Sequence, residues 1–139
     1  GLRTAQQMLF LMARNPVLRQ EQMPDLARSD AVFDAAVAES VRTTDANDLL
    51  YALEASRDYD PAPGLEKIRA LLVAINFADD LINPPELGIL EREIKRVPRG
   101  RALTIPMTPQ SRGHGTHTVA AVWKEHLAEL LRNSASHAR

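Results

Sequence analysis

The chain has 139 residues, of which 17 are Lys or Arg, 18 are Asp or Glu and none is Cys. This length corresponds to about one domain, and the formal net charge of −1 leaves no basic footprint of the kind that nucleic-acid-binding proteins carry. The missing cysteines exclude disulfide scaffolds, thiolate zinc sites and cysteine nucleophiles. The hydrophobic fraction of 45% is that of an ordinary folded globular protein.

The sequence predicts neither a membrane span nor a secretory signal. The apolar run 70–75 is six residues long, far shorter than a helix that crosses a bilayer. The N-terminus lacks the basic-then-apolar order of a signal peptide. Because a cysteine-free chain fits a reducing compartment, we expect a cytoplasmic protein. Residue 1 is Gly rather than Met, so we expect a processed product or a piece of a longer protein.

Residues 1–64 have the pattern of a helical segment. The expected helices cover 2–13, 30–42 and 45–57, and the Pro- and Gly-containing stretch 58–64 is expected to be a loop. Pro16 should end the first helix. Ser29 or Asp30 is expected to be the N-cap of the second helix, and Asp45 that of the third.

Residues 65–133 alternate between short apolar runs and amphipathic stretches. Strands are expected over 70–75 and 102–105, helices over 83–97 and 118–131, and a loop over 113–117. The order is β-α-β-α, and two parallel strands joined by a helix form a right-handed unit. Such strands are usually central members of a larger sheet, so we expect further strands outside this chain. Residues 134–139 are expected to form a flexible tail.

Two loops follow the carboxyl ends of the expected strands. The first contains Asp79 and Asp80, and the second contains His114 and His117. Ligands of open parallel sheets bind beyond these strand ends, so an acid and a histidine should lie side by side there. Such a pair forms the acid and the base of a Ser-His-Asp catalytic triad, in which the acid fixes the imidazole tautomer and stabilises the imidazolium. The order Asp before His is that of α/β-hydrolases.

The nucleophile of such a triad is missing from the sequence. The G-x-S-x-G motif is absent, and none of the six serines lies between an expected strand and an expected helix. Ser111 is in the same loop as His114, whereas the nucleophile should approach from another element. We therefore expect the serine to lie outside this chain.

Three segments, in this order and spacing, resemble the C-terminal part of one family. They are Asp45-Ala-Asn-Asp-Leu-Leu-Tyr51 followed by Asp58-Tyr-Asp60, then Leu72-Val-Ala-Ile-Asn-Phe-Ala-Asp-Asp80-Leu-Ile-Asn-Pro84, then Gly113-His114. The family is that of the α/β-hydrolase-fold homoserine O-acetyltransferases, which also contains esterase-like hydrolases. In that family the first segment is a D-x-N-S-Y-L-Y pattern before an acid-rich loop. The second is the penultimate strand with its acid loop, and the third is a terminal Gly-His. The likeness covers roughly residues 1–132.

The resemblance implies an architecture and a site. Residues 1–64 would form a helical lid, and residues 65–133 would form the C-terminal part of an α/β-hydrolase core. Most of the sheet, the oxyanion hole and the serine would precede this chain. Asp80 rather than Asp79 would be the acid of the catalytic triad, and His114 would be its base.

One position departs from the family pattern. Acetyltransferases of the family commonly have Gly-His-Asp, in which the acid would hold the amino group of the substrate, whereas this chain has Gly115 after His114. The departure favours a serine ester hydrolase, with homoserine O-acetyltransferase using acetyl-CoA as the alternative. Hydrolysis and acyl transfer share one acyl-enzyme. The expected partner is a small-molecule ester or acyl acceptor, and no metal or organic cofactor is expected.

Simpler interpretations exist for each of these residues. Asp80 could be only an acid at a helix N-terminus. His114 and His117 form H-x-x-H, which could bind a metal, although the sequence offers no evident third ligand. His117 otherwise reads as a supporting or helix-start residue, and Trp123 as a core residue.

An alternative from another class is a non-catalytic interaction module. It would pair with another chain through its exposed sheet edge and first helix, because unpaired strands favour association. For these 139 residues on their own, under either interpretation, we expect a homodimer or association through the surface of the missing sheet. We expect no membrane and no nucleic-acid partner.

Overall fold

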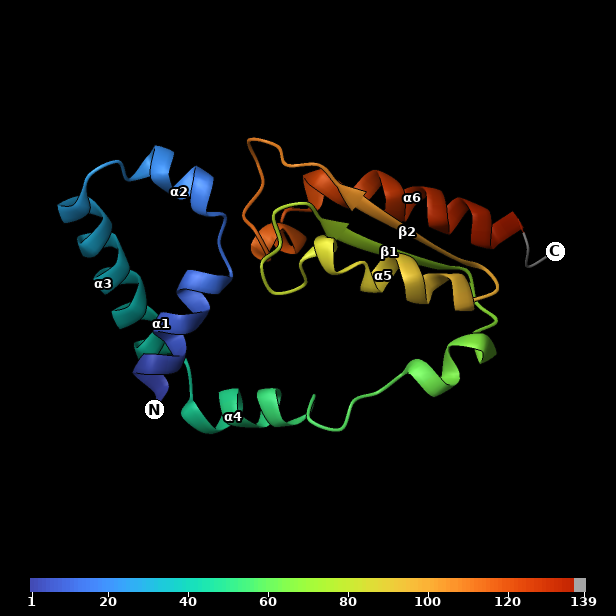
Figure 1. Cartoon of the computed structure of the whole chain (residues 1–139), viewed down its shortest axis with the longest axis horizontal. Coiled ribbons are helices and arrows are strands. Elements are labelled where there is room, and N and C mark those ends of the chain that lie inside the picture. Colours follow the sequence, from blue (N-terminus) through green and yellow to red (C-terminus); the bar gives the residue numbers. More distant parts are fainter. Residues whose placement is uncertain (137–139) are drawn as a thin grey trace.

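The computed structural model describes residues 1–136, which form a helical part and an α/β part (Figure 1). The α-helices are α1 (Leu2–Met12), α2 (Pro16–Gln22), α3 (Leu26–Thr43), α4 (Ala46–Glu54), α5 (Ile89–Glu93) and α6 (Ala120–Ser136). The strands are β1 (Leu72–Phe77) and β2 (Gly100–Ile105), and 3-10 helices cover Ala62–Lys67, Pro85–Leu87, Ile94–Arg96 and Gly115–Thr118. Among these residues no helix is both long and apolar enough to cross a membrane.

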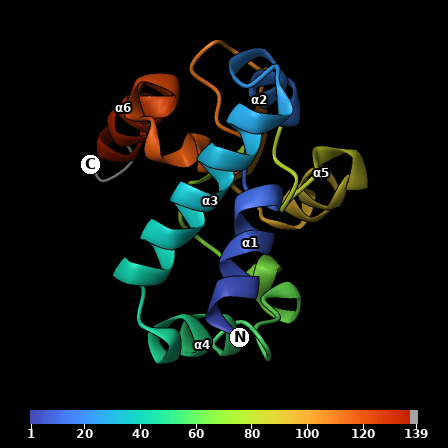
Figure 2. The same ribbon diagram turned by 90° about the vertical axis from the view of Figure 1, so that its left-hand side faces the viewer.

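The helical part is built on α1 and α3, which lie side by side in both views (Figures 1 and 2). The rings of Phe10 and Phe33 pack edge to face with their centroids 5.1 Å apart, and Val37 is almost completely buried. Edge-to-face packing is a favoured geometry for aromatic pairs. The apolar faces of these two helices therefore supply the core of this part.

The helix caps correct one prediction and confirm another. Helix α3 begins earlier than expected, with Asp25 as its N-cap, whose carboxylate accepts a hydrogen bond from the Arg28 amide at 2.8 Å. Ser29 and Asp30, the expected caps, lie inside the helix because Asp25 already satisfies the first turn. Asp45 caps α4 as expected, accepting hydrogen bonds from the amides of the first turn.

The sequence prediction missed α2. Pro16 was expected only to end the first helix, but it is also the first residue of α2, where its missing N–H has no helical partner to lose. The side-chain oxygen of Asn15 accepts hydrogen bonds from the amides of Val17 at 2.8 Å and Leu18 at 3.1 Å. Helix α1 already ends at Met12, and Asn15 is the N-cap of the next helix.

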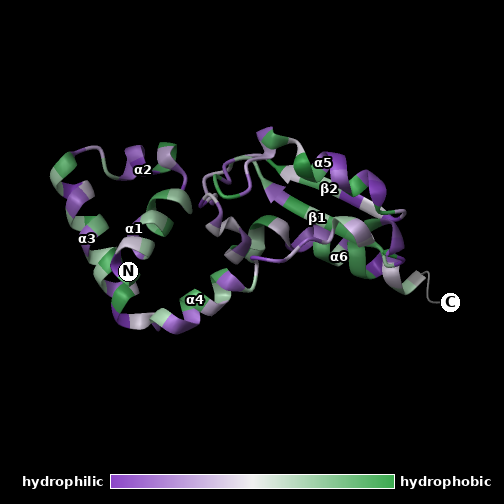
Figure 3. Ribbon diagram, turned by 60° about the horizontal axis from the view of Figure 1, so that its bottom comes forward, coloured by the Kyte–Doolittle hydropathy of each residue, from purple (hydrophilic) through white to green (hydrophobic). Residues whose placement is uncertain are grey.

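The α/β part contains a two-stranded parallel sheet with β1 and β2 in register from Leu72 opposite Gly100 to Phe77 opposite Ile105. Both strands are largely hydrophobic, and α5 and α6 lie on opposite sides of them (Figures 1 and 3). Within the described residues each strand has one unpaired edge. The expected parallel pair is confirmed, and the domain is of mixed α/β type.

The helix expected over 83–97 is broken into short turns. Gly88 adopts a left-handed conformation, with φ of +61°, between the 3-10 turn Pro85–Leu87 and α5. Such a φ is accessible to glycine without a steric cost, and it interrupts the right-handed helix at this point. A second change to 3-10 geometry at Ile94 ends the segment before β2.

The last helix is longer than expected. Helix α6 continues to Ser136, so residues 134–136 are helical where the start of a flexible tail was expected. The rest of that expected tail, residues 137–139, lies outside the described residues.

Candidate functional site

Asp80 lies in the loop that leaves the carboxyl end of β1. One carboxylate oxygen, Oδ1, accepts hydrogen bonds from the amides of Ile82 at 2.8 Å and Asn83 at 3.0 Å. Asn76 holds the same loop by donating from its side-chain amide to the Asn83 carbonyl at 2.8 Å. Both amide donors to Asp80 precede the 3-10 turn that begins at Pro85. Asp80 therefore organises its own loop and is not an acid at the N-terminus of a helix.

The other oxygen of Asp80 contacts His114. Asp80 Oδ2 lies 2.9 Å from His114 Nδ1. The Asp80 side chain is 5% exposed and the His114 side chain 34% exposed. The two residues are 34 positions apart in the sequence. They meet because the parallel pairing of β1 and β2 brings the loops at the carboxyl ends of both strands together. The expected proximity of this acid and this histidine is confirmed, while their catalytic role stays a prediction.

The surroundings of Asp80 keep it ionised. Burial by itself would raise the pKa of this carboxyl group, but the hydrogen bonds from the Asn83 amide, His114 and the Ile82 amide outweigh it and hold the pKa below its ordinary value. A carboxylate accepts from Nδ1–H and so selects the tautomer whose Nε2 has a free lone pair. Nε2 makes no hydrogen bond to any described residue.

Two residues of the following segment support the His114 ring. The His117 ring packs against it edge to face, with centroids 5.2 Å apart, and His117 Nδ1 donates to the His114 carbonyl at 2.6 Å. Trp123 Nε1 donates to the His117 carbonyl at 2.9 Å. His117 thus has the expected supporting position. Trp123, expected in the core, is half-buried and links α6 to this segment.

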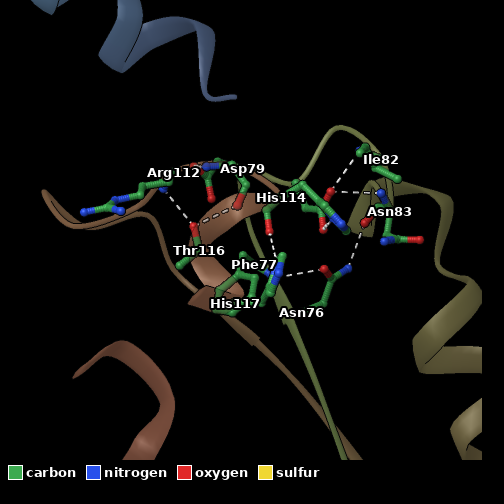
Figure 4. Close-up of polar contacts among 11 residues, drawn as sticks. Asn76, Phe77, Asp79, Ile82, Asn83, Arg112, His114, Thr116 and His117 are labelled. Atoms are coloured by element: carbon green, nitrogen blue, oxygen red, sulfur yellow. Dashed lines mark hydrogen bonds and ion pairs between the residues drawn. The ribbon is translucent and has the colours of Figure 1, made fainter. Parts of the chain in front are cut away.

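Thr116 closes the loop that carries His114. It is completely buried, and its Oγ1 accepts from the Arg112 amide at 2.7 Å and donates to the Gly113 carbonyl at 2.8 Å (Figure 4). Buried polar groups that lack partners are costly, so one hydroxyl here satisfies two backbone groups. Thr116 was not among the expected site residues, and the only sequence signal for it is a hydroxyl side chain close to Gly113 and Gly115.

Asp79 and Asn15 form a second contact that the sequence analysis missed. Asp79 Oδ2 accepts from the Gly113 amide at 2.8 Å and from the side-chain amide of Asn15, also at 2.8 Å. Asp79 Oδ1 is buried without a hydrogen-bond partner among the described residues. The two neighbouring acids therefore differ: Asp80 holds the His114 ring, and Asp79 ties the backbone of the same loop to the helical part.

Replacing Thr116 with Val is expected to lower the free energy of unfolding by about 1–3 kcal/mol. The side chain keeps its shape, but the Arg112 amide loses its hydrogen-bond partner, and the Gly113 carbonyl keeps only the hydrogen bond from the Thr116 amide. Urea unfolding followed by circular dichroism measures the effect. Thr118→Val is the matched control, because the Thr118 hydroxyl donates only to an exposed carbonyl. Equal stability of the two variants would contradict the assigned role of Thr116.

The structure places no third candidate metal ligand beside His114 and His117 among the described residues. Within residues 1–136 no group of three or more potential His or carboxylate ligands gathers around one point. His117 Nδ1 is also engaged with a carbonyl, as described above.

An open cavity of about 1030 Å³ adjoins the Asp80–His114 pair. Asp80, His114 and His117 are among its lining residues, together with apolar side chains such as Phe77 and Leu90 and with charged side chains of α5. Functional pockets commonly combine apolar walls with a few polar groups. The pair is thus placed where a small molecule has access to the imidazole.

The chain was compared with protein-family models, curated proteins and solved structures. No family model matches the chain, and neither the curated proteins nor the solved structures contain a significant match to it.

Proposed function

We propose that this chain supplies the acid and the histidine of a Ser-His-Asp triad in an α/β-hydrolase-type serine ester hydrolase. The single observation that carries the proposal is the 2.9 Å contact between His114 Nδ1 and the buried, ionised Asp80 beyond the ends of two parallel strands. The serine would come from polypeptide outside these 139 residues, because none of the serines whose side chains are described contacts His114.

The proposed chemistry follows from the tautomer that Asp80 selects. His114 Nε2 takes the proton of the serine hydroxyl as the oxygen attacks the ester carbonyl, and it then gives that proton to the departing alcohol. Water repeats the sequence on the acyl-enzyme, which releases the acid and the free serine. Asp80 remains ionised throughout and stabilises the imidazolium that forms in each step.

Hydrolysis is favoured over transfer by the residue after the histidine. Gly115 carries no charge that could pair with the ammonium group of an amino-acid acceptor. Transfer of an acetyl group from acetyl-CoA to homoserine is the alternative, and it would use Asp80 and His114 in the same roles. The two reactions differ only in whether water or an alcohol attacks the acyl-enzyme.

A second candidate function is association with another chain. The free edges of β1 and β2 and the exposed side chains of Leu50, Tyr51 and Leu53 on α4 support it, because unpaired edges and apolar patches favour contacts between chains. The missing sheet of an α/β-hydrolase would cover the same strand edges. Labelling of a serine therefore separates the two candidates.

The experiment uses the full natural reading frame that contains these residues. The purified protein is treated with a fluorophosphonate probe, and its intact mass is measured. We expect a single adduct on serine and its loss in His114→Ala. His126→Ala on α6 is the matched control and should keep the adduct. A folded protein that gains no adduct would contradict the triad and favour the interaction module.

A further inference from the structure

A depression of about 410 Å³ lies between the helical part and the loop that carries His114, and it shares no lining residue with the cavity beside Asp80 and His114. Four arginines line it: Arg14 after α1, Arg19 on α2, Arg28 on α3 and Arg112 in the loop after β2. No Asp or Glu is among its lining residues. Figure 2 shows the three helices together, with the loop after β2 beside α2. The depression therefore gathers positive charge from two helices, the segment after α1 and the loop after β2.

These arginines differ from most others in the chain because no carboxylate neutralises them. Ion pairs to Asp or Glu are made by Arg3, Arg42, Arg57, Arg92, Arg96 and Arg101. Arg14, Arg19, Arg28 and Arg112 make none with any described residue. Four cations gathered around one depression without a carboxylate partner suit an anionic ligand.

The guanidinium of Arg19 is held in place before any ligand arrives. Its Cζ lies 3.7 Å from the centroid of the Phe10 ring, and Nη2 donates to the Phe10 carbonyl at 2.9 Å. Arg14 Cζ lies 6.0 Å from the same centroid. A guanidinium has five N–H donors, so Arg19 retains several that make no hydrogen bond to the described residues. An ordered cation of this kind loses little entropy when it binds an anion.

The two neighbouring cations also repel each other. Burial lowers the pKa of Arg19, and the charge of Arg14 lowers it further. Arginine nevertheless stays protonated in proteins, so the repulsion persists at every physiological pH. An anion between the two guanidinium groups would remove it.

We propose that this depression binds a small phosphate-type polyanion, of the class of inorganic pyrophosphate or a diphosphate ester. The planar guanidinium fork matches the geometry of phosphate oxygens, and four cations from separate elements fit several negative charges better than one. The volume lies in the ordinary range of small-molecule sites. The proposal is independent of the proposed hydrolase function, because it uses neither Asp80 nor His114.

Isothermal titration of the chain with inorganic pyrophosphate tests the proposal, at constant ionic strength and low chloride. We expect saturable binding of one pyrophosphate, and Arg14→Gln should raise Kd by about tenfold or more, as for the loss of one charge-assisted hydrogen bond. The double variant Arg14→Gln/Arg112→Gln should abolish binding. Arg101→Gln is the matched control, because Arg101 pairs with Glu129 outside the depression, and it should leave Kd unchanged.

Thermal unfolding gives a second readout and a check on folding. Pyrophosphate should raise Tm of the unsubstituted chain, because a bound anion links the helices to the loop after β2, and it should not raise Tm of the double variant. Circular dichroism confirms that each variant is folded. Binding of citrate as tight as that of pyrophosphate would overturn the phosphate assignment. Absence of pyrophosphate binding, or equal weakening by Arg101→Gln, would overturn the site.

Discussion

In the proposed triad, replacing Asp80 by Asn is expected to slow the acylation of the serine about ten-thousandfold. The Asn amide would donate a hydrogen bond to His114 Nδ1, whereas the Asp80 carboxylate accepts one from His114 Nδ1. The imidazole would then carry its proton on Nε2 and could not accept the proton of the serine. The backbone hydrogen bonds to Oδ1 can be kept by the Asn carbonyl, so the loop should stay folded.

The rate of fluorophosphonate labelling measures this loss. Glu86→Gln is the matched control, since Glu86 is an exposed carboxylate a few residues further along the chain, and its labelling rate should equal that of the unsubstituted protein. Nitrogen-15 spectra of the imidazole report the tautomer directly, and Asp80→Asn should move the proton from Nδ1 to Nε2. An unchanged labelling rate in Asp80→Asn would contradict the role of Asp80.

Replacing Gly113 by Ala is expected to lower the free energy of unfolding by about 4 kcal/mol, the sum of backbone strain and overpacking. Gly113 has φ of +61°, and an added Cβ would lie 2.8 Å from the Arg14 carbonyl carbon and 2.9 Å from the Asn15 amide nitrogen. Both atoms are backbone and have little freedom to move. The loop would have to shift, and His114 would move away from Asp80 with it.

Two other glycines separate the causes of this effect. Gly88 has the same φ of +61° but open space around a new Cβ, so Gly88→Ala should show the strain alone, about 1–2 kcal/mol. Gly115 has no positive φ and only an ordinary contact of 3.7 Å, so Gly115→Ala should be close to neutral. Urea unfolding of the three variants gives the comparison. If Gly113→Ala lost no more stability than Gly88→Ala, the close approach of the Gly113 loop to the helical part would be wrong.

The helix boundaries show the limits of local patterns. Asp25 rather than Ser29 or Asp30 caps α3, and Asn15 caps a helix that was not predicted. In each case several residues could serve as a cap by composition. The choice depends on where the chain turns, and that in turn depends on packing between helices. The segment around Gly88 also differs from its local pattern, because the positive φ of Gly88 interrupts a helix that the neighbouring residues would otherwise favour.

The contacts of Asp79 could not be predicted from local sequence patterns. Its partners are Asn15, 64 positions away, and Gly113, 34 positions away. Neighbouring carboxylates look alike in a sequence, and only the direction of the chain after β1 decides which of them faces the histidine. The resemblance to a family was what selected Asp80 over Asp79.

The sequence by itself determined the parallel strand pair, the order of an acid loop before a histidine loop, and the meeting of those two loops. These follow from local periodicity and from the rule that parallel strands end at the same edge of a sheet. Only the tertiary structure decided how the histidine loop is held, through Asp79, Asn15 and Thr116, and which arginines share one depression. Those contacts join residues far apart in the chain, and their partners are chosen by packing rather than by spacing.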